Sequence, residues 1–211
     1  MVSDRGAQEI ATALWRIERW IAAHAPGWSQ VGGAQPLFSP PASEQALAGF
    51  ALHLALPLPH DLRALLLTRN GNRAGSYPLP MRATAPTKWR LLSVAEIAEA
   101  SGFLDGIARD VPFEGTVRGI GPVRAVWWSR AWVPIADCGV GDYVCIDLDP
   151  AAGGAVGQLI LYAHVFAERK VLYRAALDWI SESADELEAG RYVYEPGVGM
   201  VEAGQHSSEG R

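Results

Sequence analysis

The chain has 211 residues, of which 49% are hydrophobic and 19% charged, so it can build a sizeable core and is not globally disordered. Its net charge of -5 and its scattered arginines give no support for nucleic-acid binding, which requires clustered Lys and Arg against phosphates. Two cysteines, Cys138 and Cys145, are too few for a disulfide framework.

The start of the chain carries no targeting signal that can be read. Residues Met1 to Gly6 are polar and lack the apolar core of a signal peptide. No apolar stretch approaches the roughly 20 residues that a membrane-spanning helix needs. We therefore expect a cytoplasmic protein.

Helical periodicity dominates the first half of the chain. Apolar residues repeat at helical spacing from Glu9 to His24. A second helix begins after Ser43, which is a good N-cap, and a third has Pro59 in its first turn. Asn70-Gly71 is expected to end that third helix, because this pair tolerates a left-handed conformation.

The next helix has the most specific start signal in the sequence. Residues 72–90 read as a loop, and Ser93-Val94-Ala95-Glu96 then forms a capping box, in which the two side chains each accept from the other's backbone N–H. This helix is expected to run to about Arg109.

Strands dominate the second half, followed by one closing helix with Leu177, Ile180, Ala184 and Leu187 on one face and Gly190 at its end. The predicted strands are Val126–Trp128, Trp132–Ile135, Tyr143–Leu148, Gln158–Ala163 and Lys170–Arg174. Segregation of helices and strands predicts an α+β fold with a largely antiparallel sheet. We expect a single domain over residues 1–194 and a flexible tail over 195–211.

Signatures of catalysis are weak. The chain has no G-x-S-x-G, H-E-x-x-H, P-loop or dinucleotide-binding motif, and its histidines are dispersed. His164, near Arg169, is either a proton-transfer group or a solvated turn residue. Cys138 and Cys145 flank a glycine turn, where they either meet across a hairpin or pack as separate thiols.

Asp147-Leu148-Asp149 is the sharpest candidate for chemistry. Strand alternation places both carboxylates on one face just before Pro150, an arrangement that suits a hard cation such as Mg²⁺. A small metal-dependent transferase is one interpretation, although the βαβ units that would hold a nucleotide are missing. The others are a turn at the strand end and contact with a basic partner.

Aromatic residues gather around the predicted sheet. They are either core or recognition surface, and core packing is the default because aromatic residues most often stabilise by burial. The cluster consists of Trp28, Trp89, Trp127, Trp128 and Trp132.

Several blocks, in order, resemble the SUKH superfamily, also called the Smi/Knr cell-wall-assembly regulator family. The likeness covers the chain from about Trp15 to Tyr194. The blocks are Leu58-Pro59-His60-Asp61-Leu62-Arg63 with Asn70-Gly71, Trp89-Arg90-Leu91-Leu92-Ser93, Trp132-Val133-Pro134-Ile135-Ala136, Gly141-Asp142-Tyr143, Cys145 to Pro150, Gly157-Gln158-Leu159-Ile160 and Leu177-Asp178-Trp179-Ile180.

This resemblance implies an α+β domain that binds proteins rather than catalyses, with no cofactor and no metal. It implies a bacterial immunity protein that neutralises a nuclease or deaminase toxin, or a regulator of cell-wall or signalling type. The composition, rich in Ala, Gly and Arg, is typical of a bacterial protein from a GC-rich genome. The partner-binding residues that we expect are Trp132, Asp142, Tyr143, Asp147 and Asp149.

Overall fold

The computed structural model describes residues 3–25, 37–54, 57–73, 75–82, 84, 88–111, 113–195 and 199–204. The helices are α1 (Ser3–His24), α2 (Glu44–Leu54), α3 (His60–Thr68), α4 (Val94–Asp110) and α5 (Ala176–Glu188). The strands are β1 (Leu79–Pro80), β2 (Lys88–Leu91), β3 (Arg118–Ile120), β4 (Trp132–Asp137), β5 (Tyr143–Asp147), β6 (Gln158–Tyr162), β7 (Glu168–Tyr173), β8 (Tyr192–Glu195) and β9 (Gly199–Glu202).

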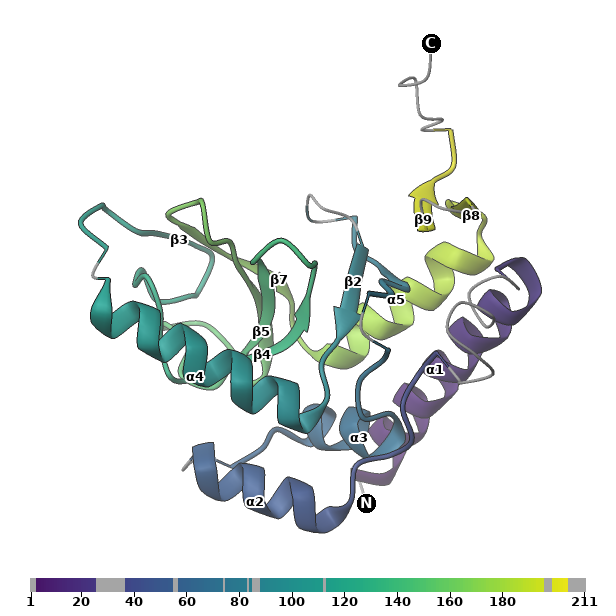
Figure 1. Ribbon diagram of the computed structural model, residues 1–211, viewed down its shortest axis with the longest axis horizontal. Coiled ribbons are helices and arrows are strands. Elements are labelled where there is room, and N and C mark those ends of the chain that lie inside the picture. The colour runs from purple at the N-terminus through teal and green to yellow at the C-terminus, as the bar shows by residue number, and fades with distance from the viewer. Residues whose placement is uncertain are drawn as a thin grey trace.

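Seven strands form one sheet in the order β1-β2-β4-β5-β6-β7-β3, and β8 and β9 form a separate pair near the C-terminus (Figure 1). Every neighbouring pair in the large sheet is antiparallel except β3 with β7. The predicted α+β class with a largely antiparallel sheet is therefore confirmed. None of the helices in the described ranges has both the length and the apolar character that crossing a bilayer requires.

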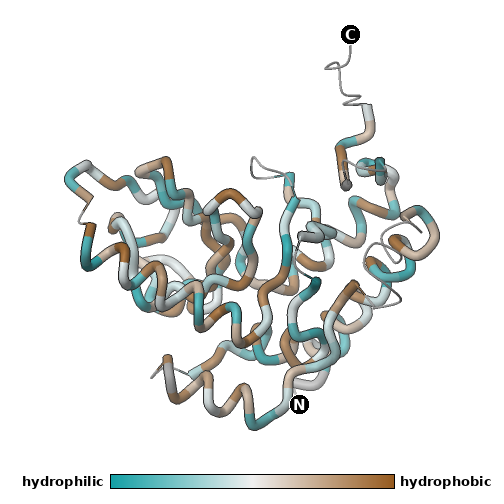
Figure 2. The backbone as a smooth tube through the Cα atoms, in the orientation of Figure 1, coloured by the Kyte–Doolittle hydropathy of each residue, from teal (hydrophilic) through white to brown (hydrophobic). Residues whose placement is uncertain are grey.

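The sheet is covered on both faces, and apolar residues gather along its central strands (Figure 2). Val144 and Ile146 of β5 pack in the larger core cluster, to which α5 contributes Trp179. Cys145, between them, packs in a smaller cluster with Leu104 of α4. Because side chains alternate across a strand, β5 is buried on both sides.

Several predicted elements differ from those observed. Val126–Trp128 is not a strand: the Trp127 ring stacks on Phe113, with centroids 4.1 Å apart, and the Trp128 indole N–H donates to Asp105. These aromatic contacts, rather than a strand ladder, fix the segment. Gly199–Glu202, within the segment expected to be a flexible tail, pairs with β8 and buries Met200.

A buried arginine anchors the segment that leads to β4. The Arg169 guanidinium of β7 lies between the Trp127 and Tyr162 rings, 4.6 Å from each centroid. It donates to the carbonyl oxygens of Trp127, Phe166 and Glu168. Since it binds carbonyl groups and aromatic faces, it ties the covering segment to the sheet through the fork geometry of its donors.

The turn after α3, Asn70-Gly71-Asn72, joins the helices to the sheet. Asn70 Oδ1 accepts from the Val94 N–H at the start of α4, at 2.9 Å. Asn72 Oδ1 accepts from the Leu91 N–H of β2, at 2.7 Å. Gly71 has a left-handed φ of 77°, but it does not end α3 as expected, because the helix ends at Thr68 with Arg69 extended. A Cβ at Gly71 would lie 2.5 Å from the Ser93 backbone nitrogen.

Three glycine substitutions separate the two reasons for a glycine at position 71, which are its left-handed φ and its close approach to Leu92 and Ser93. Gly75→Ala, at φ 76° in open space, should cost about 1–2 kcal/mol through left-handed strain alone. Gly71→Ala should cost roughly 2 kcal/mol more, because backbone atoms of Leu92 and Ser93 cannot move away from the new methyl group. Denaturant unfolding measures both.

Gly49→Ala is the matched control, since Gly49 lies in α2 with nothing within 4 Å of the added Cβ. It should stabilise the protein by about 0.5–1 kcal/mol through helix propensity. Equal losses for Gly71→Ala and Gly75→Ala would contradict the close approach of the turn to β2 and α4.

Candidate functional site

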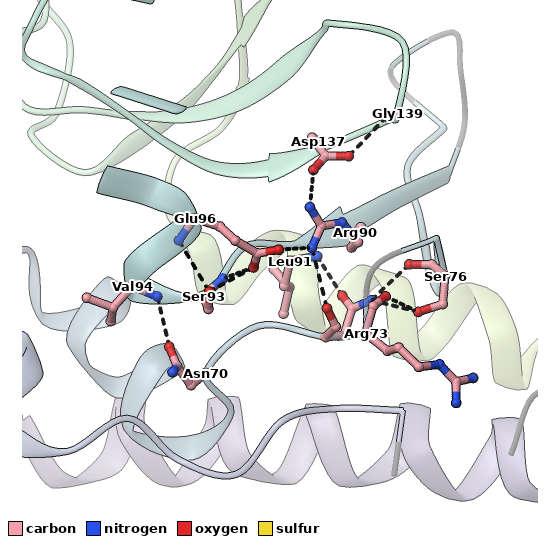
Figure 3. A network of polar contacts seen from close by, with 11 residues as sticks. Asn70, Arg73, Ser76, Arg90, Leu91, Ser93, Val94, Glu96, Asp137 and Gly139 are labelled. Carbon is pink, nitrogen blue, oxygen red and sulfur yellow. Dashed lines mark hydrogen bonds and ion pairs between the residues drawn. The ribbon is translucent and has the colours of Figure 1, made fainter. Parts of the chain in front are cut away.

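Arg90 of β2 joins three parts of the chain at the start of α4 (Figure 3). Its Nη1 donates to Glu96 Oε1 of α4, and its Nη2 donates to Asp137 Oδ2 of β4, both at 2.6 Å. Nη1 also lies 3.5 Å from the carbonyl oxygen of Asn72. One guanidinium therefore fixes the helix, the sheet and the turn after α3 relative to one another.

Glu96 has a second role as the acidic member of the predicted capping box, which is confirmed. Its Oε2 accepts from the Ser93 backbone N–H and from Ser93 Oγ, each at 2.8 Å. Asp137 is likewise shared, because its Oδ1 accepts from the Gly139 N–H at 3.0 Å. The carboxylates of the network therefore have partners on both oxygens.

The ionisation of this network follows from its contacts. Burial alone would lower the pKa of Arg90, but the charges and hydrogen bonds of Glu96 and Asp137 raise it. Burial alone would raise the pKa of Glu96, but hydrogen bonds from Ser93 and Arg90 hold it below its ordinary value. Arg90 and Glu96 are therefore both charged at neutral pH, and the network acts as a structural joint.

A groove of about 270 Å³ opens beside this joint, between α4 and strands β2, β4 and β5. Its wall combines the charged joint with apolar side chains. The lining residues are Arg90, Leu92, Glu96, Glu99, Ala100, Phe103, Asp137 and Tyr143. Glu99 makes no hydrogen bond or ion pair within the described part of the chain, and Phe103 is 59% exposed.

Tyr143 is the predicted site residue that lines this groove. It pairs with Asp137 at one end of the β4–β5 hairpin and is half-buried. Burial, and then the negative charge of Asp137, raise the pKa of its phenol, which therefore stays protonated. The hydroxyl makes no hydrogen bond to another described residue, so it can donate one to a ligand.

Asp142 lies beside Tyr143 but turns inward. It is 6% exposed, and its Oδ1 accepts from the backbone N–H of His164 at 2.9 Å and contacts His164 Nδ1 at 2.7 Å. The carboxylate thereby ties the β4–β5 turn to the β6–β7 turn. Asp142, which we expected to bind a partner, and His164, a candidate for proton transfer, thus contact each other between two turns.

Trp132 and Asp147 pair with each other at the opposite end of the hairpin. They are 1% and 0% exposed, so neither presents a surface to a partner in this conformation. This face of the sheet has a second layer of cover that sequence reasoning did not foresee. Contact of a partner with Trp132, Asp142, Tyr143, Asp147 and Asp149 stays a prediction.

The two carboxylates of Asp147-Leu148-Asp149 have different structural partners. Asp147 accepts from the Asp149 N–H and from Gln158 Nε2, both at 3.0 Å, and Asp149 pairs with Arg124 at 2.7 Å. Burial raises the pKa of Asp147, although the hydrogen bonds from Asp149 and Gln158 favour its ionised form. The buried Trp132 indole N–H has no hydrogen-bond partner among the described residues. These contacts favour the interpretation as a turn at the strand end.

Cys138 and Cys145 do not meet across the hairpin. Both are free and buried, Cys138 in the larger core cluster and Cys145 in the smaller one. The described residues contain no group of three or more His, Cys, Asp or Glu side chains with the geometry of a metal site. Trp28 lies outside the described residues, whereas Trp89 is core.

Sequence reasoning assigned no role to several residues of the groove, among them Arg90, Glu99 and Phe103. Arg90 stood inside the Trp89-Arg90-Leu91-Leu92-Ser93 block without an assigned role. The helical spacing of the sequence could have revealed Phe103. The buried residues of α4 are Ile97, Ala100 and Leu104, and a phenylalanine next to that stripe lies at the surface.

The pH dependence of stability tests the ionised joint. The lowered pKa of Glu96 means that its carboxylate stabilises the fold above the ordinary value of 4.5, and that this contribution is lost as the pH falls through the lowered pKa. Glu96→Gln keeps a capping side chain but removes the charge. It should cost about 1 kcal/mol at pH 7, since Glu96 is one-third exposed, and the difference should vanish under acidic conditions.

Glu99→Gln on the same helix serves as the control, because Glu99 makes no hydrogen bond or ion pair with the described residues. At pH 7 its unfolding free energy should match that of the unsubstituted protein. A Glu96→Gln deficit that persists unchanged below the pKa of Glu96 would refute the assignment of a stabilising charge.

Comparison with known proteins places this chain in a family. The model of the SMI1/KNR4 family (SUKH-1) matches residues 41–182. The cell wall biosynthesis/cell cycle regulator smi1 of Schizosaccharomyces pombe is 27% identical over 154 residues, which cover 66% of this chain and 30% of that protein. The KNR4/SMI1 homolog of Kluyveromyces lactis is 27% identical over 84 residues, which cover 40% of this chain and 16% of that protein.

These two relatives are fungal, so they lend no support to the bacterial origin that composition suggested. The matched part of this chain spans less than a third of the length of either relative. Since the family model covers residues 41–182 of the 211-residue chain, this protein belongs to the SMI1/KNR4 family (SUKH-1).

Proposed function

We propose that this chain is a non-catalytic protein-binding domain with a regulatory role, and that it binds through the groove between α4 and the sheet. The observation that carries the proposal is that some lining residues of the groove bind one another while others are available to a partner. Arg90, Glu96 and Asp137 bind one another. By contrast, Glu99 and the Tyr143 hydroxyl make no hydrogen bond within the described part of the chain, and Phe103 is exposed. Such a wall offers recognition contacts without a group poised to move a proton.

The relatives support the regulatory part of this proposal. The Schizosaccharomyces pombe protein is described as a regulator of cell wall biosynthesis and the cell cycle, and this chain corresponds to under a third of it. We infer that this chain, too, acts by binding within a larger regulatory system. A cytoplasmic location and one folded unit over residues 1–194 belong to the same proposal, and the free, buried cysteines are consistent with a reducing compartment.

A second candidate function is neutralisation of a basic toxin by an immunity protein. It is favoured by the net charge of -5 and by the open Glu99 carboxylate, because toxins that act on nucleic acids need a basic surface. The fungal regulators among the relatives favour the first candidate. Both functions require a protein-binding face.

Selection from a phage-displayed library of random peptides tests the groove as that face. Peptides enriched on the unsubstituted protein should bind Phe103→Ser roughly tenfold more weakly, because an exposed aromatic anchor contributes a large share of binding free energy. Biolayer interferometry of each enriched clone measures the loss.

Val156→Ser is the matched control, since Val156 is 66% exposed and lies outside the groove, in the turn between β5 and β6. It should bind the same clones with unchanged affinity. The proposal fails if no peptide is enriched, or if the enriched clones bind Phe103→Ser as tightly as they bind Val156→Ser.

A further inference from the structure

We infer that the groove between α4 and the sheet takes a peptide segment in which an Arg or Lys stands next to an apolar side chain. This inference rests on the proposed function and adds the chemistry of the partner. Its basis is the juxtaposition of an unpaired carboxylate, Glu99, with two aromatic side chains, Phe103 and Tyr143, around one small groove.

The charge of the groove selects a cation. Arg90 supplies one positive charge against the two carboxylates of Glu96 and Asp137, which leaves a net negative charge in the joint. Glu99 adds a second negative charge. It is exposed at the groove and makes no ion pair among the described residues. A Lys or Arg of the partner would pair with Glu99, whereas a phosphate or an acidic segment would be repelled.

The apolar part of the wall selects the neighbouring side chain. Phe103 is 59% exposed on α4, and Tyr143 is half-buried on β5 with its hydroxyl open. Leu92 and Ala100 complete the apolar lining between the helix and the sheet. An aliphatic or aromatic side chain would cover these surfaces, and the stem of the basic residue would lie along the Phe103 ring.

The size of the groove favours side chains of a peptide over a small molecule. Its volume of about 270 Å³ is below the range of roughly 300–1,000 Å³ that is usual for ligand and cofactor pockets. It is also bounded on one side by a helix that the Arg90 network holds in place. A short segment can enter with two neighbouring side chains and leave its backbone at the surface.

Substitution of Glu99 tests the charge requirement with synthetic versions of the peptides enriched by the library selection. Those peptides should contain an Arg or Lys beside an apolar residue. Glu99→Gln should weaken their binding about threefold to tenfold, and Glu99→Lys should weaken it further. The affinity for the unsubstituted protein should fall as salt is added, because the pair is partly exposed.

Glu114→Gln is the matched control, as Glu114 is exposed and lies outside the groove. It should leave peptide binding unchanged. Replacement of the basic residue of the peptide by Glu should abolish binding to the unsubstituted protein and restore part of it with Glu99→Lys. Circular dichroism of each variant confirms that the fold is intact.

The outcomes separate this inference from the proposed function. The basic-partner inference is overturned if the enriched peptides are acidic or neutral and bind Phe103→Ser more weakly but Glu99→Gln with unchanged affinity. That result would leave the protein-binding groove standing. Enriched peptides that ignore both residues, or an absence of enrichment, would overturn both. Dependence on Glu99 and on the basic residue of the peptide, with no effect at Glu114, supports the inference.

Discussion

The fold depends on how the Asn70-Gly71-Asn72 turn and the Arg90 guanidinium lock α4 to the sheet. The turn satisfies the first N–H of α4 and an N–H of β2, and its glycine allows the backbone to approach Ser93. Arg90 then adds charge-assisted hydrogen bonds to Glu96 and Asp137. Without this joint the helix that forms one wall of the groove would have no fixed position.

Double cover of the sheet decides which residues can take part in recognition. With helices on one face and α4 and the aromatic segment before β4 on the other, even charged residues of the central strands are buried. Asp147 and Arg169 are fully buried and bind amide or carbonyl groups. The proposed recognition surface therefore lies at the rim, where a helix meets strand ends and turns.

Local rules predicted much of this architecture and part of the groove. The capping box at Ser93, the left-handed glycine at position 71 and the inward side of β5 all followed from sequence, because each depends on neighbouring residues. Burial of Trp132 and Asp147 did not follow, since it depends on a layer supplied by distant segments. The aromatic stacking of Trp127 and the parallel pairing of β3 with β7 are likewise long-range.

The two sides of α4 differ in burial. Ile97, Ala100 and Leu104 pack in the core and hold the helix on the sheet. Glu99 and Phe103 are exposed and belong to neither core cluster. Under the proposed function, substitutions at those outward positions would change the recognition surface at little cost to folding. The domain could then acquire new partners during evolution while its scaffold stays the same.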